Sequence, residues 1–233
     1  MNGIDKKIRR IEKTPGVFNW ARLNSERKDE TVDRIVRLAD SSHMQSLRPI
    51  YGLCTSVANR SKSFDDCMAK ISAYRGYHRD AAEGILPVFQ NWVEISQVET
   101  VDAFSEENYL FPFARNDKGK VSSIPLKPHF VVIRGEQLRP TYLLGWAHIP
   151  LSLFQIRLAC SVIRHAVLTR LDFIGADASV LTFQQDKWTK NRLQGEWSVN
   201  TFGNMPLDEV AVHTNRYSEA LQEAIAIISS RDS

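Results

Sequence analysis

The densest combination of side chains able to bind a polyanion is Tyr-Arg-Gly-Tyr-His-Arg-Asp at residues 74–80. Arg75 and Arg79 could each hold a phosphate group, and Tyr77 and His78 offer planar rings on which a base can stack. Such clusters are enriched at single-stranded nucleic acid sites without being specific to them. The alternative is that the charged residues form an ordinary solvated helix face.

A second polar group consists of Arg157, Ser161, Arg164 and His165. Their spacing places them along one line of an expected helix, opposite a strongly apolar face. If this stripe faces solvent, it could follow a phosphate backbone or accept an acidic partner. If it packs beside a sheet, ion pairs with carboxylates such as Glu136 explain it equally well.

A third arrangement has the residue types of a metal-dependent phosphodiesterase. Asp172 stands at an expected helix-to-strand junction, and Gln185 and Lys187 follow at the end of the next strand-like run. These residues are similar to the metal site of the PD-(D/E)XK nuclease superfamily. The resemblance implies that Asp172 and Gln185 hold Mg²⁺ and that Lys187 stabilises the attacking water or the charge at phosphorus.

This resemblance departs from the family pattern in two ways. No Pro precedes Asp172, and Gln185 stands where Glu is commoner, which puts metal affinity in doubt. Asp177 could replace Asp172 if the strand starts later. The alternative is that Asp172 caps a turn and Lys187 is a solvated strand end.

Arg37 and His43, in Arg-Leu-Ala-Asp-Ser-Ser-His, have a spacing that resembles the HEPN ribonucleases. The resemblance implies an all-helical fold in which the Arg stabilises a phosphorane and the His is a general acid or base. Leu38 departs from this family, which typically has a polar residue there, and the second half of this chain has the pattern of strands.

Two further groups of basic residues are weaker candidates. The N-terminal run comprises Lys6, Lys7, Arg9, Arg10 and Lys13, diluted by Asp5 and Glu12. Trp188 and Trp197 lie near Lys187, Lys190 and Arg192, and form either a second contact surface or part of the sheet packing. Basic arms often bind nucleic acid, but solvated helix ends have the same composition.

Composition bounds the class of protein. The 233 residues are 43% hydrophobic and 24% charged, values typical of a soluble globular chain. No apolar run reaches the roughly 18 residues that span a bilayer, and no apolar segment follows the N-terminal basic residues, so we expect neither a membrane span nor a secretory signal. Three widely spaced cysteines favour reduced core thiols and a cytoplasmic location. The net charge of +3 is weak evidence for an anionic partner.

Periodicity and turn residues predict an α+β fold. Pro15 and Gly16 should leave residues 1–24 as a basic N-terminal arm. Helical spacing predicts a helical subdomain at 25–97, packed with an α+β domain at 98–233 as one compact unit. Within 98–233 we expect an antiparallel β-meander, including hairpins around residues 116–119 and Gly135, with covering helices at 151–170 and 206–229.

These observations favour a nucleic-acid-associated or complex-forming accessory protein without catalytic activity or cofactor. Its predicted contact residues are Arg75, Tyr77, His78, Arg79, Arg157, Arg164 and His165. Two alternatives stay open. One is a nuclease that uses Asp172, Gln185 and Lys187 and requires Mg²⁺. The other is a structural scaffold that forms homo-oligomers through its C-terminal helix.

Overall fold

The computed structural model describes residues 3–41, 46–101, 109–115, 121–134 and 136–231. Helices form the N-terminal part of the described chain: α1 (Gly3–Glu12), α2 (Val17–Leu23), α3 (Lys28–Asp40), α4 (Arg48–Ala58), α5 (Phe64–Ile71) and α6 (Tyr77–Ser96). The later helices are α7 (Leu153–Ile163), continued by the π-helical turn η2 (Arg164–Leu168), the short 3₁₀ turns η3 (Leu171–Phe173) and η4 (Val199–Thr201), and α8 (Leu207–Ser230).

The strands form two sheets. They are β1 (Glu99–Val101), β2 (Leu110–Arg115), β3 (Val121–Pro125), β4 (Phe130–Arg134), β5 (Gln137–Leu144), β6 (Ser179–Gln185) and β7 (Arg192–Ser198). The larger sheet has the order β1-β4-β5-β6-β7, and β2 and β3 form a separate antiparallel hairpin. The α+β class and both predicted hairpins are confirmed, although residues 116–120 and Gly135 lie outside the described residues.

One strand pair differs from the predicted antiparallel meander. β5 and β6 are parallel, with Thr141 opposite Ser179 and Leu144 opposite Thr182, whereas the other pairs of the larger sheet are antiparallel. Two parallel neighbours cannot be joined by a tight turn, so the chain returns through α7, η2 and η3. The helix predicted at 151–170 is therefore a crossover between two strands of one sheet.

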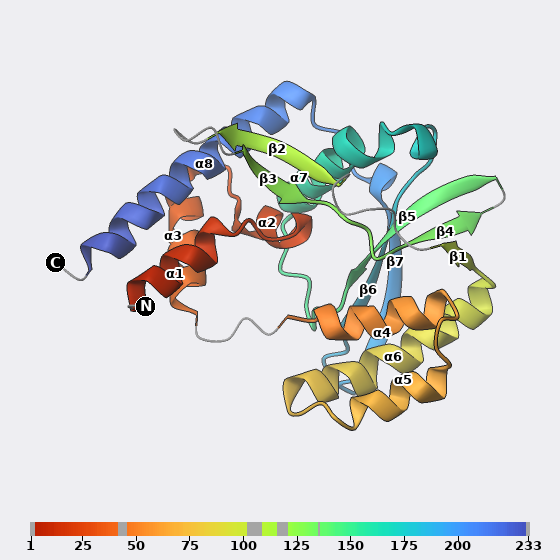
Figure 1. Cartoon of the computed structure of the whole chain (residues 1–233). Helices are drawn as coiled ribbons and strands as arrows, with labels where there is room; N and C mark the ends of the chain where they lie inside the picture. Colours follow the sequence, from red (N-terminus) through yellow and green to blue (C-terminus); the bar gives the residue numbers. More distant parts are fainter. Residues whose placement is uncertain (1–2, 42–45, 102–108, 116–120, 135, 232–233) are drawn as a thin grey trace.

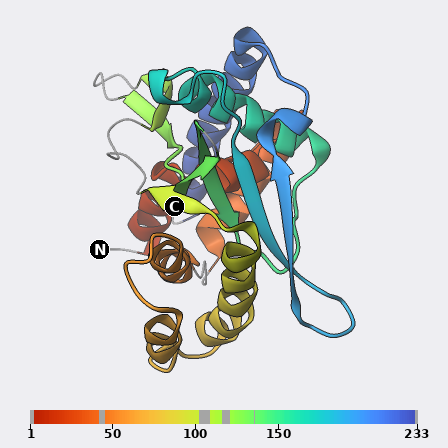
Figure 2. The same ribbon diagram turned by 90° about the vertical axis from the view of Figure 1, so that its right-hand side faces the viewer.

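Helices cover both faces of the larger sheet (Figures 1 and 2). The strands alternate accordingly, because successive side chains point to opposite faces. Phe130, Leu143 and Phe183 pack against α4, α5 and α6. Tyr142 and Val180, on the other face, belong to the core formed with α1, α2, α3, α7, α8 and the β2–β3 hairpin.

The N-terminal segments occupy different places from those predicted. Within the predicted arm, the described residues 3–24 pack into the core through α1 and α2, with Ile11 and Trp20 almost completely buried. The predicted helical subdomain is divided between the two faces of the sheet. α3 packs against α8, whereas α4, α5 and α6 cover the opposite face.

A capping box at the start of α7 connects the crossover to α2. Ser152 Oγ accepts a hydrogen bond from the Gln155 N–H, and the Gln155 side chain accepts one from the Ser152 N–H. Gln155 is buried, and its Nε2 donates to the carbonyl oxygens of Arg22 and Asn24, at 2.9 and 2.7 Å. These bonds satisfy carbonyls at the C-terminal end of α2 that have no partner within the helix.

The C-terminal helix α8 is amphipathic, as its spacing predicts. Its apolar face includes Val210, Tyr217, Leu221 and Ile228, and it packs against α3, α1 and β2 of the same chain. Tyr217 packs edge-to-face against Trp20 at 5.9 Å between ring centroids. This face is therefore packed against other elements of the same chain. Among the described residues, no helix is long and apolar enough to cross a membrane.

Substitution of Gly145 should destabilise the protein, because this residue has no space for a side chain. A Cβ atom would lie 2.8 Å from Ile85 Cδ1, 3.0 Å from Leu47 Cδ1 and 3.2 Å from Tyr51 Cε1. We expect Gly145→Ala to lower the free energy of unfolding by about 1–3 kcal/mol in urea titrations. Gly52→Ala, in the open interior of α4, should raise it by about 0.5–1 kcal/mol. If both variants changed the free energy of unfolding in the same direction, the result would contradict this packing.

His129 should make the protein less stable in acid. Its Nδ1 accepts a hydrogen bond from the Leu143 N–H at 3.0 Å, and burial lowers its pKa from 6.5 to about 4. The neutral His129 of the folded protein contributes fully to the free energy of unfolding above about pH 6.5. This contribution is lost as the pH falls toward 4. Urea unfolding between pH 7 and 4.5 should show a smaller decline for His129→Asn than for the wild type. The exposed control, His148→Asn, should follow the wild type.

Candidate nucleic-acid interface

The first predicted cluster lies at the start of α6. Gly76 has a φ of 50°, a conformation that favours glycine, and it places Arg75 just outside the helix and Tyr77 at its first residue. His78 Nε2 lies 3.0 Å from the Ser46 carbonyl oxygen and connects this end of α6 to the segment before α4. Tyr77 remains 40% exposed. Arg75 is exposed and has no hydrogen bond or ion pair with another described residue.

Arg79 is the one member of this cluster with a carboxylate partner among the described residues. Its Nε donates to Glu83 Oε1 at 2.8 Å, one helical turn further on. Both side chains are about half exposed, so solvent screens the pair and it contributes little to the stability of the helix. An exposed pair of this strength does not prevent Arg79 from binding another anion.

The turn between β6 and β7 is held by one carboxylate. Asp186 Oδ1 accepts the N–H groups of Trp188 and Thr189, at 3.0 and 2.7 Å, and the Thr189 hydroxyl at 3.0 Å. These hydrogen bonds lower the pKa of Asp186. Lys190 adopts a φ of 62° and closes the turn by donating its N–H to the Asp186 carbonyl. The turn thus has a defined conformation without contribution from the Trp188 ring, which is 90% exposed.

Trp188 and Trp197, which the sequence analysis placed in one group, have different roles in the structure. Trp197 is half-buried and packs edge-to-face against Phe18 and Phe202, with ring centroids 5.9 and 5.1 Å apart. Trp197 is therefore a sheet-packing residue. Trp188 has no ring contact of this kind with a described residue and stands between Lys187 and Lys190 in the sequence.

Arg192 connects the β6–β7 turn to α6. It is the first residue of β7, its stem packs against Gly84 of α6, and its guanidinium donates to the Gly145 and Phe183 carbonyl oxygens at 3.2 and 2.8 Å. The start of α6 and the β6–β7 turn consequently lie at the same end of the molecule (Figures 1 and 2). The contact between Arg192 and Gly84 joins two elements that are more than 100 residues apart in the sequence.

The Arg157, Arg164 and His165 stripe has a structural role. Arg157 donates to the Gly203 and Asn204 carbonyl oxygens, both at 3.2 Å, and its ion pair is with Glu209 rather than Glu136. Arg164 donates to Asn200 Oδ1 at 3.0 Å and to the Val199 and Phe202 carbonyls. His165 Nε2 lies 2.8 Å from the Met205 carbonyl. The stripe therefore holds segment 199–205 against α7 and η2, as the packing alternative predicts.

The residues of the nuclease alternative do not lie together. Asp172 is in η3, before the start of β6, whereas Gln185 is the last residue of that strand. A seven-residue strand is about 20 Å long, so Asp172 and Gln185 lie at opposite ends of β6. Gln185 Nε2 donates to the Lys190 carbonyl at 2.8 Å within the turn. Asp177 is also at the wrong end, where its carboxylate accepts from the Ser198 hydroxyl.

The structure gives no support for a nucleic acid site at the HEPN-like motif or at the N-terminal run of basic residues. His43 lies outside the described residues, and the sheet in the second half does not fit an all-helical family. Within the N-terminal run, Lys7 forms a 2.7 Å ion pair with Asp40, and Arg10 donates to the Ala39 and Ser41 carbonyls. These contacts attach α1 to the end of α3.

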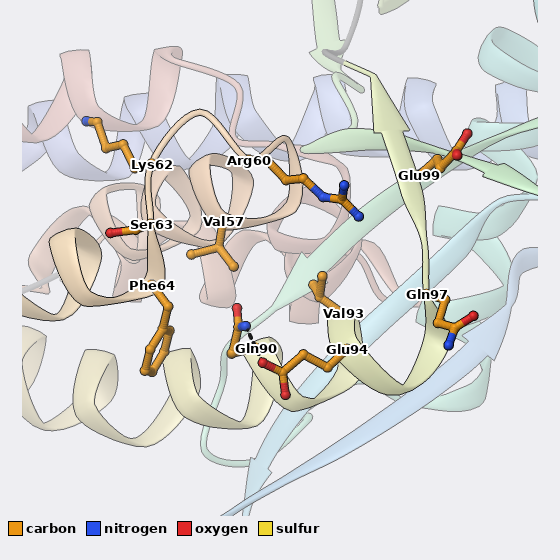
Figure 3. A pocket seen from close by; sticks show the side chains of 10 residues that line it. All are labelled: Val57, Arg60, Lys62, Ser63, Phe64, Gln90, Val93, Glu94, Gln97 and Glu99. Carbon is orange, nitrogen blue, oxygen red and sulfur yellow. Dashed lines mark hydrogen bonds between the residues drawn. The ribbon is translucent and has the colours of Figure 1, made fainter.

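An open cavity of about 690 Å³ lies at the other end of α6 (Figure 3). Val57, Phe64 and Val93 supply its apolar lining. Arg60 and Lys62 come from the segment between α4 and α5, and the acidic residues Glu94 and Glu99 come from α6 and β1. Charges of both signs therefore line the cavity, and its overall charge does not select one class of ligand.

The thiols are poorly suited to nucleophilic catalysis. Cys54, Cys67 and Cys160 are free and buried, as the sequence predicts. Burial raises the pKa of all three thiols, that of Cys160 to about 12, so they stay protonated near neutral pH. Among the described residues, no group of three or more His, Cys, Asp and Glu side chains could hold a metal ion.

The comparisons with known proteins give no relative. Neither a family model, nor a curated protein, nor a solved structure matches the chain. The physical properties of the site are therefore the basis for a functional assignment.

Sequence reasoning missed a contact between α2 and the segment after β5. The Arg22 guanidinium lies over the Trp146 indole, 5.4 Å from the ring centroid, although the two residues are far apart in the chain. Arg22 comes from the segment predicted to be an arm, and Trp146 from the segment after β5. No local spacing could have indicated this pair, because the contact arises from tertiary packing.

The structural role of Arg164 leads to a direct test. Arg164→Ala leaves several carbonyls of segment 199–205 without a donor, so we expect the free energy of unfolding to fall by about 1–3 kcal/mol. Urea titration checks this result against Arg9→Ala, an exposed residue of α1. If Arg164→Ala were as stable as the wild type but bound oligonucleotides more weakly, Arg164 would instead be a nucleic-acid-contacting residue.

Proposed function

We propose that this chain is a nucleic-acid-associated accessory protein that binds single-stranded DNA or RNA and has no catalytic activity of its own. The proposed contact surface comprises Arg75, Tyr77, His78 and Arg79 at the start of α6, with Lys187, Trp188 and Lys190 in the β6–β7 turn. The observation that carries the proposal is the 90% exposure of Trp188 on a turn whose conformation is maintained by Asp186.

The hydrogen bonds of the turn make Trp188 suited to stacking. An indole on a flexible loop loses conformational freedom on binding, whereas this turn is already ordered by Asp186. Base stacking on an aromatic side chain contributes about 1–3 kcal/mol per base and tolerates any sequence. Lys187 and Lys190 flank Trp188 in the turn and supply the positive charge that would attract the phosphates next to a stacked base.

An unpaired base fits this arrangement better than a duplex does. Bases in a duplex are stacked on one another, so an indole reaches a base face only where the strand is single or distorted. Tyr77, exposed at the same end of the molecule, offers a second ring. Arg75 and Arg79 then extend the positive surface beyond the turn.

The proposed location is the cytoplasm, where single-stranded RNA is available to a protein of this type. Three buried, unpaired thiols support this part of the proposal, because reduced cysteines persist in that compartment. A protein partner is the competing occupant of the same surface, since Trp, Tyr and Arg are also enriched at the centres of protein interfaces.

Fluorescence polarisation with short labelled single- and double-stranded DNA and RNA tests the proposal. At about 50 mM salt we expect binding that favours single strands and weakens steeply toward about 200 mM. Trp188→Ala should weaken binding by about 5- to 150-fold, the equivalent of one lost stacking interaction. Leu171→Ala is the matched control, because Leu171 is 89% exposed but lies in η3.

The basic residues are tested with paired variants. Arg75→Ala with Arg79→Ala should weaken binding and reduce its salt dependence, whereas Arg9→Ala with Lys13→Ala should change neither. Equal affinities for wild type and Trp188→Ala, or no binding at about 50 mM salt, would contradict the proposed surface. Cleavage of the recovered oligonucleotides in Mg²⁺ would contradict the absence of catalysis.

A further inference from the structure

The side chain of Arg22 is not used to stabilise the helix that carries it. At the C-terminal end of α2, the Arg22 and Asn24 carbonyl oxygens accept hydrogen bonds from Arg34 Nη1 and Gln155 Nε2. These bonds leave the Arg22 guanidinium itself to lie over the Trp146 indole, at 5.4 Å from the ring centroid. The contact orients the guanidinium but uses none of its N–H groups in a hydrogen bond.

Arg22 has no counter-charge in the described part of the chain. It is half-buried, yet it forms no hydrogen bond or ion pair through its guanidinium with a described residue. Burial lowers its pKa, and no neighbouring carboxylate opposes that effect. Partly burying a cation without an anion is unfavourable, so an anion that bound there would relieve this cost.

A second uncompensated cation lies beside the same stretch of backbone. Arg192 is also half-buried, and its guanidinium donates to two backbone carbonyls, of Gly145 and Phe183, rather than to a carboxylate. Arg192 donates to the Gly145 carbonyl, and Arg22 lies over the ring of Trp146, the next residue. The two guanidinium groups therefore contact adjacent residues of the chain. The fold therefore places two positive charges where β5 ends, and among the described residues no acid pairs with either one.

The position in the fold is one at which ligands commonly bind. Trp146 follows the carboxyl end of β5, and the Gln185 N–H at the carboxyl end of the parallel strand β6 donates to the Ala147 carbonyl at 2.8 Å. In open sheets with helices on both faces, ligands bind outside the carboxyl ends of parallel strands. Trp146 packs against the cores on both sides of the sheet, so it lies between the two helical layers.

We propose that Arg22 binds a phosphate group at the carboxyl end of β5, with Trp146 fixing the plane of the guanidinium and Arg192 contributing its positive field. A guanidinium with free N–H groups matches two phosphate oxygens at once. A phosphate, which can carry two negative charges, balances the two guanidinium groups better than a carboxylate does. This site is distinct from the proposed nucleic acid surface and does not require that surface to function.

Thermal unfolding in inorganic pyrophosphate tests the site, with ionic strength matched by potassium chloride. Pyrophosphate that binds the native state should raise the Tm of the wild type in a saturable manner. Arg22→Met keeps the apolar stem over Trp146 but removes the charge, so it should abolish this rise. Arg22→Lys keeps the charge without the planar fork and should reduce the rise, and Arg9→Met should leave it unchanged.

An equal, saturable rise in Arg22→Met and wild type would overturn the proposal, as would the absence of a saturable rise in the wild type. If Arg22→Met does not fold, the same comparison is made with Arg22→Lys. Folded Arg22→Met should also be at least as stable as wild type without pyrophosphate, because it removes an uncompensated charge. A markedly lower Tm in that buffer would assign Arg22 a structural role instead.

Two further ligands identify the source of the phosphate. If Arg22→Met loses the response to pyrophosphate and also binds the single-stranded oligonucleotide more weakly than the wild type, the site holds a backbone phosphate of nucleic acid. If Arg22→Met loses the response to pyrophosphate and to adenosine monophosphate but retains oligonucleotide affinity, the site belongs to a small phosphorylated ligand. Failure of nucleic acid binding alone would leave the pyrophosphate response, and hence this site, intact.

Discussion

The parallel pairing of β5 with β6 is the constraint on which the rest of the structure depends. Parallel strands require a crossover, and the crossover through α7 buries one face of the sheet while α4, α5 and α6 bury the other. The same pairing brings the carboxyl ends of two central strands to one end of the molecule. Gly145, Trp146 and the β6–β7 turn lie at that end, together with the start of α6.

Local features of the fold were predictable, and long-range pairing was not. Turn residues identified both hairpins, and helical spacing identified α7 and α8 to within a few residues. Pro15 and Gly16 do separate two elements, but the pattern could not show that Ile11 and Trp20 are buried. The direction of β6 relative to β5 depends on which strand it joins, and hydrophobic periodicity does not specify a partner.

For the candidate site, too, the sequence predicted local spacing but not the tertiary contacts. Arg157, Arg164 and His165 do share one line of a helix, but their partners are backbone groups of segment 199–205, about 40 residues later in the chain. Asp172 and Gln185 are close in sequence but separated by the length of a strand. The exposure of Trp188, and the lack of a carboxylate partner for Arg22 among the described residues, depend on how the chain packs in three dimensions.

We propose that nucleic acid contacts the end of the molecule formed by the start of α6 and the β6–β7 turn. Photo-crosslinking of a 4-thiouridine-containing single-stranded RNA, followed by mass spectrometry of the crosslinked peptides, tests it most directly. We expect crosslinks in peptides containing Tyr77 and Trp188, and we expect unlabelled single strands to compete for them. Crosslinks confined to α7 and segment 199–205, or to the cavity lined by Arg60 and Glu99, would contradict it.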